Sequence, residues 1–255
     1  MTALDRFAFV LFSPKSSGNV GAAARALKNM GLGDLRLVAP RDYDPRAAAA
    51  MAVHAGDVLD RARIFPDLAA ALDDRTLIVG TTCRVGPYRS ETRALREAAP
   101  ALVGESAANR VAIIFGPEDF GLTNLEIARC HRLITIPTAP DYPSLNLAQA
   151  VIVVAYELML AAGAARTPAS IGQFASAGDV EAMHHRMAEA LVAIGFLPAE
   201  NPDHLMLTLR AMLGRSGVRP RELEILNGIA RQVRWVAEDG AATLAAKRAS
   251  GRKLR

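Results

Sequence analysis

The sequence predicts an α/β protein with a parallel sheet that carries helices on both faces. Two apolar, β-branched runs, Val111–Phe115 and residues 133–136, each end in a turn that contains Gly or Pro. Continuous apolar runs of this kind are typical of parallel strands that are buried on both faces. A long apolar helical pattern follows the second run, and further short runs alternate with helical patterns from residue 7 onward. This alternation favours a parallel sheet over other architectures.

The first sixty residues contain two strand–helix units. Phe7–Phe12 is an apolar strand, and a polar turn leads to a helix over residues 21–30. We expect this helix to end at Gly31, because glycine accepts the left-handed conformation that closes many helices. Residues 35–39 form the next strand, which Pro40 closes, and the Ala-rich stretch 45–59 predicts one helix.

The middle of the chain continues the alternation with shorter elements. Residues 64–65 predict a brief strand and 68–72 a helical turn, and residues 76–80 form a clear strand. A polar loop then leads to a helix over residues 91–98. Another helix is expected after Thr123, between the two apolar runs described above.

The last third of the chain predicts a separate helical unit. A stretch rich in small residues precedes helical patterns at 179–195, 203–214 and 220–238. Pro202 and Pro220 lie where the start of a helix tolerates proline. We therefore divide the chain into an α/β domain (1–165), a linker (166–178), a helical extension (179–240) and a basic tail (241–255).

The distribution of charge separates these parts. Residues 1–165 carry 17 basic and 17 acidic side chains, whereas residues 166–255 carry 13 and 9, so the net charge of +4 arises in the C-terminal third. The final nine residues hold five positive charges. Basic tails commonly contact polyanions such as nucleic acid, although a solvated terminus explains the tail equally well.

The composition indicates a soluble, cytoplasmic protein. Half of the 255 residues are apolar, enough for one large core. No secretory signal is recognisable, and Gln149 and Glu157 interrupt the most apolar helix, so we expect no membrane span. Cys83 and Cys130 form neither a disulfide framework nor a zinc set, and no cluster of ligands predicts a metal.

Four turns at the carboxyl ends of predicted strands are candidate ligand sites, because ligands of open α/β sheets bind there. The first turn precedes the helix that contains Arg25. From spacing alone, the simpler interpretation is that Arg25 is a surface arginine on an amphipathic helix. In the second, Glu118 lies between Gly116 and Gly121, and glycines let a backbone pass close to a ligand. The side chain of Glu118 can orient a ribose, cap the following helix or be solvated.

The other two turns contain polar side chains. Residues 137–146 end in Ser144-Leu145-Asn146, where Ser144 or Asn146 is a plausible helix cap. Residues 81–84 follow a strand and begin a loop rich in arginine, a residue well suited to phosphate. We treat Arg84 and Arg89 of this loop as candidate RNA contacts, with scattered surface arginines as the alternative.

Three motifs in register resemble the SPOUT superfamily of RNA methyltransferases, in its TrmH branch and most specifically the TrmJ group. The resemblance covers about residues 6–162. The motifs are Asn19-x-Gly21-x-x-x-Arg25, then Phe115-Gly116-x-Glu118-x-x-Gly121-Leu122-Thr123-Asn124, then Ile136-Pro137 with Ser144-Leu145-Asn146-Leu147-Ala148.

This resemblance implies a fold with a deep trefoil knot in the C-terminal part of the sheet and S-adenosylmethionine bound in that knot. It implies a homodimer whose active site uses both chains. The implied cofactor-binding residues are Thr81, Thr82, Cys83, Gly116, Pro117, Glu118, Gly121, Ile136, Pro143, Ser144 and Leu145. The implied catalytic residues are Asn19, Arg25, Ser144 and Asn146, with Arg25 supplied by the partner chain and also contacting RNA.

The implied reaction is 2′-O-methylation of cytidine or uridine 32 in the anticodon loop of tRNA. Methyl transfer from a sulfonium depends on positioning, and oxyanion character at the ribose must be stabilised. Because guanidinium stays protonated, Arg25 suits phosphate or oxyanion binding better than the role of a base, and the sequence leaves these roles open. Two alternatives remain: methylation of another RNA site, either ribosomal or at the wobble nucleotide, and a non-catalytic knotted RNA-binding factor.

Overall fold

The computed structural model describes residues 2–84, 86–164, 172–198 and 200–240, and it contains one seven-stranded sheet. Every strand pair is parallel, and the strand order is β3-β2-β1-β6-β4-β7-β5. The strands are β1 (Phe7–Phe12), β2 (Asp34–Val38), β3 (Arg63–Phe65), β4 (Leu77–Thr81), β5 (Thr92–Ala94), β6 (Val111–Phe115) and β7 (Arg132–Thr135). The predicted parallel sheet is confirmed.

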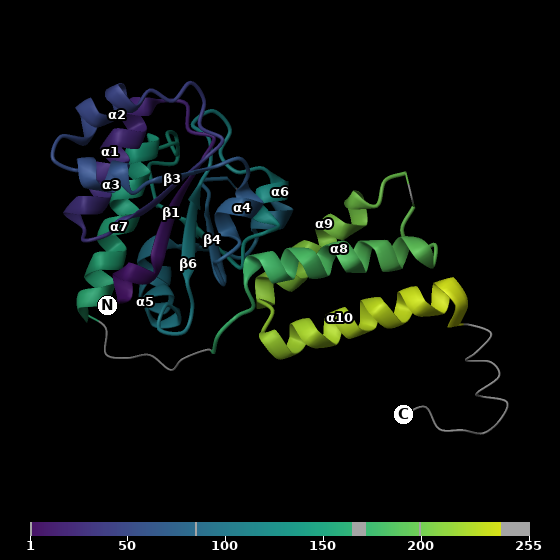
Figure 1. The fold of residues 1–255 in the computed structure, drawn as a ribbon. Coiled ribbons are helices and arrows are strands. Elements are labelled where there is room, and N and C mark those ends of the chain that lie inside the picture. The colour runs from purple at the N-terminus through teal and green to yellow at the C-terminus, as the bar shows by residue number, and fades with distance from the viewer. Residues whose placement is uncertain (1, 85, 165–171, 199, 241–255) are drawn as a thin grey trace.

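Helices cover both faces of the sheet, as predicted (Figure 1). In the α/β domain they are α1 (Ser17–Asn29), α2 (Pro45–Ala52), α3 (Gly56–Asp60), α4 (Leu68–Leu72), α5 (Leu95–Glu105), α6 (Asn124–Ile127) and α7 (Leu147–Ala164). Two 3-10 turns, η1 (Ala3–Arg6) and η2 (Pro87–Arg89), complete this domain. The larger core lies between the sheet and α1, α5 and α7, and the smaller one lies under α4 and α6.

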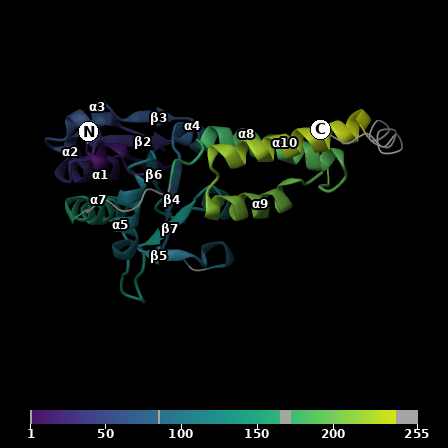
Figure 2. The same ribbon diagram turned by 90° about the horizontal axis from the view of Figure 1, so that it is seen from below.

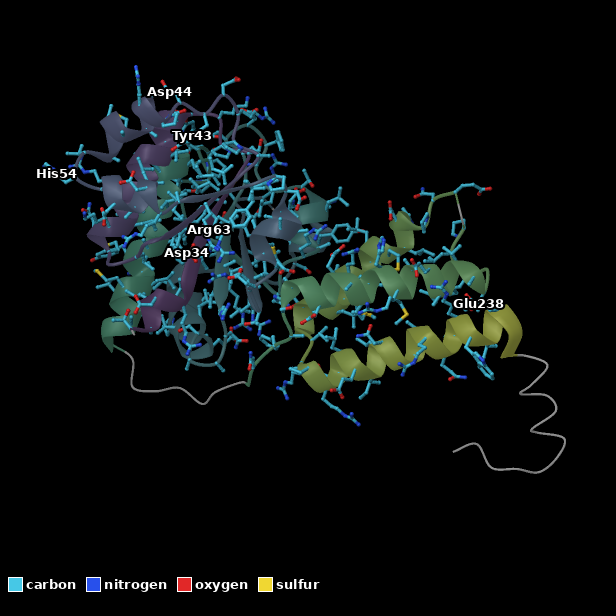
Figure 3. All side chains as sticks on the ribbon, in the orientation of Figure 1. Asp34, Tyr43, Asp44, His54, Arg63 and Glu238 are labelled. Carbon is cyan, nitrogen blue, oxygen red and sulfur yellow. The ribbon has the colours of Figure 1, made fainter. Side chains whose placement is uncertain are left out.

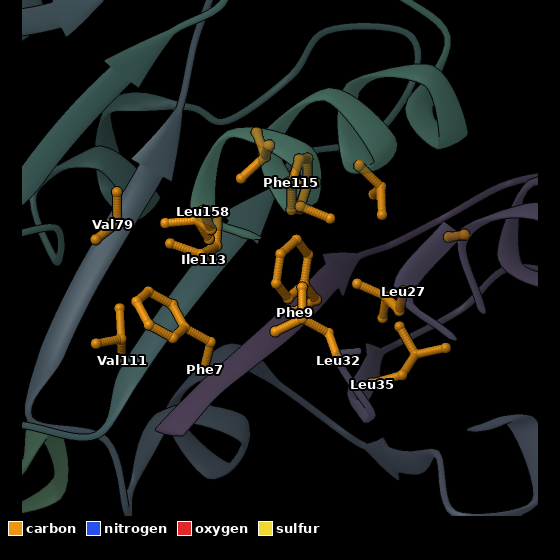
Figure 4. Close-up of a cluster of buried hydrophobic side chains, with 14 of the residues drawn as sticks. Phe7, Phe9, Leu27, Leu32, Leu35, Val79, Val111, Ile113, Phe115 and Leu158 are labelled. Carbon is orange, nitrogen blue, oxygen red and sulfur yellow. The ribbon is translucent and has the colours of Figure 1, made fainter. Parts of the chain in front are cut away.

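Alternation along the central strands builds these two cores. In β6, Val111, Ile113 and Phe115 belong to the larger core, while Ala112 and Ile114 belong to the smaller one. Figure 4 shows the larger core, in which the rings of Phe9 and Phe115 stack with centroids 5.7 Å apart. Strands β1 and β6 are neighbours at the middle of the sheet, so side chains on both of their faces are removed from water.

Two predicted helices differ in extent from the sequence predictions, and α1 begins at Ser17 instead of the predicted residue 21. The helix expected over residues 45–59 is broken into α2 and α3, because Val53 adopts a positive φ of 55° and turns the chain. The helix expected over residues 91–98 begins only at Leu95, because Thr92–Ala94 pairs with β7 as the edge strand β5.

The helical extension projects from one side of the α/β domain (Figures 1 and 2). It consists of α8 (Ala177–Ala193), α9 (Asp203–Ser216), α10 (Pro220–Trp235) and a π-helical turn (Val236–Gly240), and α8 packs against α10. The predicted tail, residues 241–255, and residues 166–171 of the predicted linker lie outside the described residues. No helix within the described ranges is long and apolar enough to cross a membrane.

The extension contacts the α/β domain closely. The N–H of Ala177 donates to the carbonyl of Arg75 at 2.7 Å, and a Cβ on Gly178 would lie 1.8 Å from Oδ1 of Asp73. A Cβ on Gly214 would lie 3.2 Å from the carbonyl oxygen of Ala128. Glycine therefore allows α8 to lie against the side chain of Asp73 and α9 to lie against the backbone of Ala128.

Candidate active site

A cavity of about 280 Å³ lies at the carboxyl ends of β4, β6 and β7. Its walls come from the loop after β4, the turn after β6 and the segment between β7 and α7. All eleven residues predicted to bind the cofactor line it. They are Thr81, Thr82, Cys83, Gly116, Pro117, Glu118, Gly121, Ile136, Pro143, Ser144 and Leu145. The structure thus brings together, in one cavity, residues that are up to 64 positions apart in the sequence.

Glycine is required where the turn after β6 folds back on itself. A Cβ on Gly116 would lie 2.3 Å from the carbonyl carbon of Gly121 and 2.4 Å from the backbone nitrogen of Leu122. Gly121 has a φ of 62°, a conformation that side chains disfavour. A side chain at Gly116 would therefore push the turn away from the end of β6, and one at Gly121 would strain its backbone.

The end of β4 forms a second wall and is held by its own polar groups. The hydroxyl of Thr81 donates to the carbonyl of Ile114 at 2.9 Å, and the N–H of Thr82 donates to the carbonyl of Ile134 at 3.0 Å. The N–H of Arg84 donates to Oγ1 of Thr82 at 3.1 Å. These bonds connect β4 to both of its neighbours just where the cavity begins.

Three polar side chains from distant parts of the chain form a hydrogen-bonded series beside this cavity. Nδ2 of Asn19 donates to Oε1 of Glu118 at 3.0 Å, and Nδ2 of Asn146 donates to Oδ1 of Asn19 at 3.0 Å. Oε2 of Glu118 accepts the backbone N–H of Lys15, also at 3.0 Å. The series connects the start of α1, the turn after β6 and the start of α7.

This environment keeps Glu118 ionised. Burial alone would raise the pKa of Glu118, but the hydrogen bonds from the side chain of Asn19 and the backbone of Lys15 outweigh it and lower the pKa. Lys15 also forms an ion pair with Asp119, which lines the cavity. The role of Lys15 was not predictable from the sequence, because no local pattern indicates a contact across about one hundred residues.

Asn146 caps the long helix α7, whereas Ser144 lines the cavity. Oδ1 of Asn146 accepts the N–H groups of Ala148 at 2.9 Å and Gln149 at 3.4 Å. The sequence had left open whether Ser144 or Asn146 is the cap. The capping bonds fix Asn146 while its Nδ2 holds Asn19.

The three arginines predicted to contact RNA differ in their surroundings. Arg25 is exposed on α1, does not line the cavity of its own chain, and has no ion pair or hydrogen bond among the residues that the structure describes. Arg84 is exposed and lines the cavity. The guanidinium of Arg89 is half-buried and donates to Asn124 and Leu122, so its predicted RNA contact stays a prediction.

Neither a metal site nor a disulfide emerges from the described part of the chain. No group of three or more His, Cys, Asp or Glu residues within it is placed to hold a metal ion. Cys83 is exposed at the cavity and Cys130 is buried, and both are free.

Two family models match this chain. The model of the SpoU rRNA methylase family matches residues 6–156, which include the whole cavity. The model of the C-terminal domain of the tRNA methyltransferase TrmJ matches residues 178–246, which include α8 to α10 except the first residue of α8.

Similar proteins match over almost the full length. The tRNA (cytidine/uridine/adenosine-2′-O-)-methyltransferase TrmJ of Pseudomonas aeruginosa is 39% identical over 92% of this chain and 96% of its own. The tRNA (cytidine/uridine-2′-O-)-methyltransferase TrmJ of Salmonella typhimurium is 36% identical over 89% and 95%, respectively. The crystal structure of TrmJ from Z. mobilis superposes with a TM-score of 0.78 at 34% identity, covering 89% of this chain and 98% of that one.

Proposed function

Because this chain belongs to the SpoU methylase family and carries a TrmJ-type C-terminal domain, we propose that it is an S-adenosylmethionine-dependent tRNA ribose 2′-O-methyltransferase. The observation that carries this proposal is the single cavity that collects all eleven predicted cofactor residues. The relatives named as tRNA 2′-O-methyltransferases match both the α/β domain and the extension.

The cavity has the chemistry that S-adenosylmethionine requires. Ile136, Leu145 and Leu147 offer apolar surface for an adenine ring. Glu118 and Asp119 offer negative charge to a cationic sulfonium. The turn between Gly116 and Gly121 brings backbone close to any ligand there. When bound, this cofactor supplies an electrophilic methyl group, and the chain has to align the ribose with it.

The polar residues around the cavity fit this task of alignment. Asn19 and Asn146 hold each other and Glu118 in place, so the edge of the site is pre-organised before RNA arrives. We assign Ser144 and Asn146 to the ribose. Arg25 then binds phosphate or stabilises the oxyanion that develops at the 2′-oxygen, because a guanidinium remains a cation.

We further propose that the active site forms between two copies of the chain. Arg25 is exposed and outside the cavity of its own chain, so a partner's cavity is a natural place for it. On helix α7, Tyr156 is 43% exposed and Leu160 is 44% exposed. A second chain would bury these two large side chains. The trefoil knot remains an expectation that the seven-stranded parallel topology supports.

For the substrate we propose the pyrimidine at position 32 of the tRNA anticodon loop. The relatives' names include cytidine and uridine, and one adds adenosine. Residues 166–255, whose basic excess comes from the tail (241–255), supply affinity for the tRNA backbone. Arg84, at the cavity, contacts RNA directly. We also propose that the α/β domain ends at residue 165, the linker at 178 and the helical extension at 240. The proposed compartment is the cytoplasm, where thiols stay reduced.

The substitution Arg25→Ala tests the catalytic assignment. We expect kcat for tRNA methylation to fall by about a hundredfold or more, because one cationic stabiliser of the transition state is lost. The Kd for S-adenosylmethionine, measured by calorimetry without RNA, should not change, because Arg25 lies outside its own cavity. Arg46→Ala is the matched control, since Arg46 is an exposed arginine on the neighbouring helix α2.

The outcomes separate the alternatives. Unchanged turnover in Arg25→Ala would remove this residue from catalysis. Cofactor binding without methylation of tRNA by the unsubstituted chain would favour another RNA, and absence of cofactor binding would favour the non-catalytic RNA-binding factor.

A further inference from the structure

The side chain of Arg89 connects two walls of the cofactor cavity without lining the cavity itself. Nη1 of Arg89 donates to Oδ1 of Asn124 at 2.8 Å, and Nη2 donates to the carbonyl of Leu122 at 2.9 Å. Both acceptors belong to the segment that leaves the turn after β6 and enters α6. One guanidinium therefore ties the loop after β4 to the turn after β6.

The backbone of Arg89 is itself held on both sides. Its N–H donates to the carbonyl of Gly86 at 2.8 Å, and its carbonyl accepts the hydroxyl of Thr92 at 2.8 Å. Thr92 is the first residue of β5, which pairs with β7. The guanidinium thus extends from a position that is anchored to the sheet.

The segment that Arg89 holds is in tight contact with the cavity floor. The backbone nitrogen of Leu122 lies 2.4 Å from where a Cβ on Gly116 would be, and the side chain of Leu122 lies 3.3 Å from where a Cβ on Gly80 would be. Leu122 is only 3% exposed and lines the cavity. A shift of its backbone would move the wall formed by residues 116–122.

The guanidinium of Arg89 is already committed to these internal contacts. Its Nε is buried and has no hydrogen-bond partner among the residues that the structure describes, and a buried unpaired donor costs free energy. The two bonds made by the terminal nitrogens must outweigh this cost to keep the side chain in place. An arginine that awaits phosphate keeps its donors in water instead, as the exposed Arg84 and Arg93 do.

We propose that Arg89 is a positioning residue that braces the Leu122–Asn124 segment and so sets the shape of the cofactor site. The inference rests on the proposed function, because it takes S-adenosylmethionine as the ligand of this cavity. It assigns Arg89 a role in cofactor affinity, in contrast to the RNA contact that the sequence had predicted.

Calorimetry of the full-length chain with S-adenosylmethionine, in the absence of RNA, separates these two roles. Arg89→Ala should raise the Kd for the cofactor by about tenfold, because the binding turn is no longer pre-organised. The Kd of Arg89→Lys should lie between that of the unsubstituted chain and that of Arg89→Ala, since an ammonium group can replace only part of the planar guanidinium. In steady-state assays the KM for the cofactor should rise in Arg89→Ala while the KM for tRNA stays the same.

Two further variants guard against a merely structural effect. Asn124→Ala removes one acceptor, and its effect on the Kd should be less than additive with that of Arg89→Ala if the two side chains act through one contact. Arg93→Ala, an exposed arginine in the adjacent strand β5, should leave the Kd for the cofactor unchanged. Circular dichroism and melting curves identify any variant that does not fold.

Each result has a distinct meaning. An unchanged Kd for the cofactor in folded Arg89→Ala, together with a raised KM for tRNA, would overturn the brace and restore the RNA contact. If Arg89→Ala does not fold, an unchanged Kd in both Arg89→Lys and Asn124→Ala would overturn it equally. Failure of the unsubstituted chain to bind S-adenosylmethionine would overturn the proposed function and this inference with it.

Discussion

At the scale of single residues, two buried histidines lie where the α/β domain meets the helical extension. His131 is 7% exposed and His184 is 5% exposed, and both line a second cavity, between α4, α8 and α9. Nδ1 of His131 accepts the N–H of Ile78 at 2.9 Å, and its ring stacks on Phe174. An imidazole that accepts a hydrogen bond on this nitrogen has to be neutral there.

This arrangement predicts a pH-dependent stability. Burial, with a smaller effect of neighbouring arginines, lowers the pKa of both His131 and His184 from 6.5 to about 4. The unfolded chain therefore binds more protons below pH 6.5, and the free energy of unfolding should fall as the pH drops from about 6.5 towards 4. Each histidine contributes a slope of up to about 1.4 kcal/mol per pH unit.

The substitution His131→Gln keeps a hydrogen-bond acceptor but removes one titrating group. Between pH 6.5 and 5, the free energy of unfolding should therefore change less steeply with pH, by up to about 1.4 kcal/mol per pH unit. Urea unfolding at several pH values measures it. The control is His54→Gln, the same substitution at a histidine that is exposed at the outer surface (Figure 3). An equal slope in the unsubstituted chain and His131→Gln would contradict the account.

Residue-level features of the site were predictable from the sequence where they are encoded in local motifs. Gly116, Glu118 and Ser144 lie within short motifs, and the structure places all three on one cavity. Lys15 was not predictable, because its contact with Glu118 depends on how two loops meet in space. The internal role of Arg89 was hidden for the same reason, since a sequence does not show which arginine is half-buried.

At the scale of elements, helix α1 depends on close approach to α2. A Cβ on Gly21 would lie 1.9 Å from the carbonyl oxygen of Ala48, so the two helices touch backbone to backbone. Gly228, in α10, has no atom of another described element within 4 Å of such a Cβ. Packing therefore requires glycine at position 21 but not at position 228.

These two glycines give a paired prediction. Gly228→Ala should stabilise the chain by about 0.5–1 kcal/mol, because alanine loses less entropy in a helix. Gly21→Ala should destabilise it by about 1–3 kcal/mol, because α1 must move away from α2. Chemical unfolding measures both, and stabilisation by Gly21→Ala would show that the helices do not touch in this way.

Element boundaries illustrate what local patterns can and cannot show. Strands Phe7–Phe12 and Val111–Phe115 have their predicted bounds, because long apolar runs decide them. Strand β5 was not predicted, because it has only three residues and forms by pairing with β7, about forty residues later in the sequence. The break at Val53 was also missed, since β-branched residues rarely adopt a positive φ.

At the scale of the whole molecule, one ionic cluster joins the two structural units. Glu181 of α8 accepts hydrogen bonds from Arg210 of α9, at 2.8 Å to Oε1, and from Arg129 of the α/β domain, at 3.1 Å to Oε2. Burial would raise the pKa of Glu181, but the hydrogen bond from Arg210 and the charge of Arg129 outweigh it and lower the pKa. Arg129 follows α6, so the cluster connects the extension to the segment that follows the turn after β6.

Neutralising this cluster should loosen the extension. Glu181→Gln leaves two partly buried arginines without a countercharge and should cost about 1–2 kcal/mol, discounted for partial exposure. Glu224→Gln, which removes an exposed ion pair with Arg221 within α10, should cost less than about 0.5 kcal/mol. Equal losses in the two variants, measured by urea unfolding, would mean that the cluster does not support the junction.

The α/β domain holds the cavity of about 280 Å³, whereas the basic excess of the chain lies in the tail (241–255), which follows the helical extension in the sequence. The parallel sheet and the helical extension were predictable from periodicity and composition. Their relative placement was not, because it depends on close contacts at Gly178 and Gly214. This placement leaves Glu238, in the π-helical turn that follows α10, remote from the α/β domain (Figure 3).

The most direct test of the central claim is methyl transfer from labelled S-adenosylmethionine to unmodified tRNA, followed by mapping of the modified nucleotide. We expect a 2′-O-methyl group on the pyrimidine at position 32, made by the full-length chain. A methyl group on a base or at the wobble ribose would contradict this expectation. So would absence of transfer to any tRNA by a chain that binds the cofactor normally.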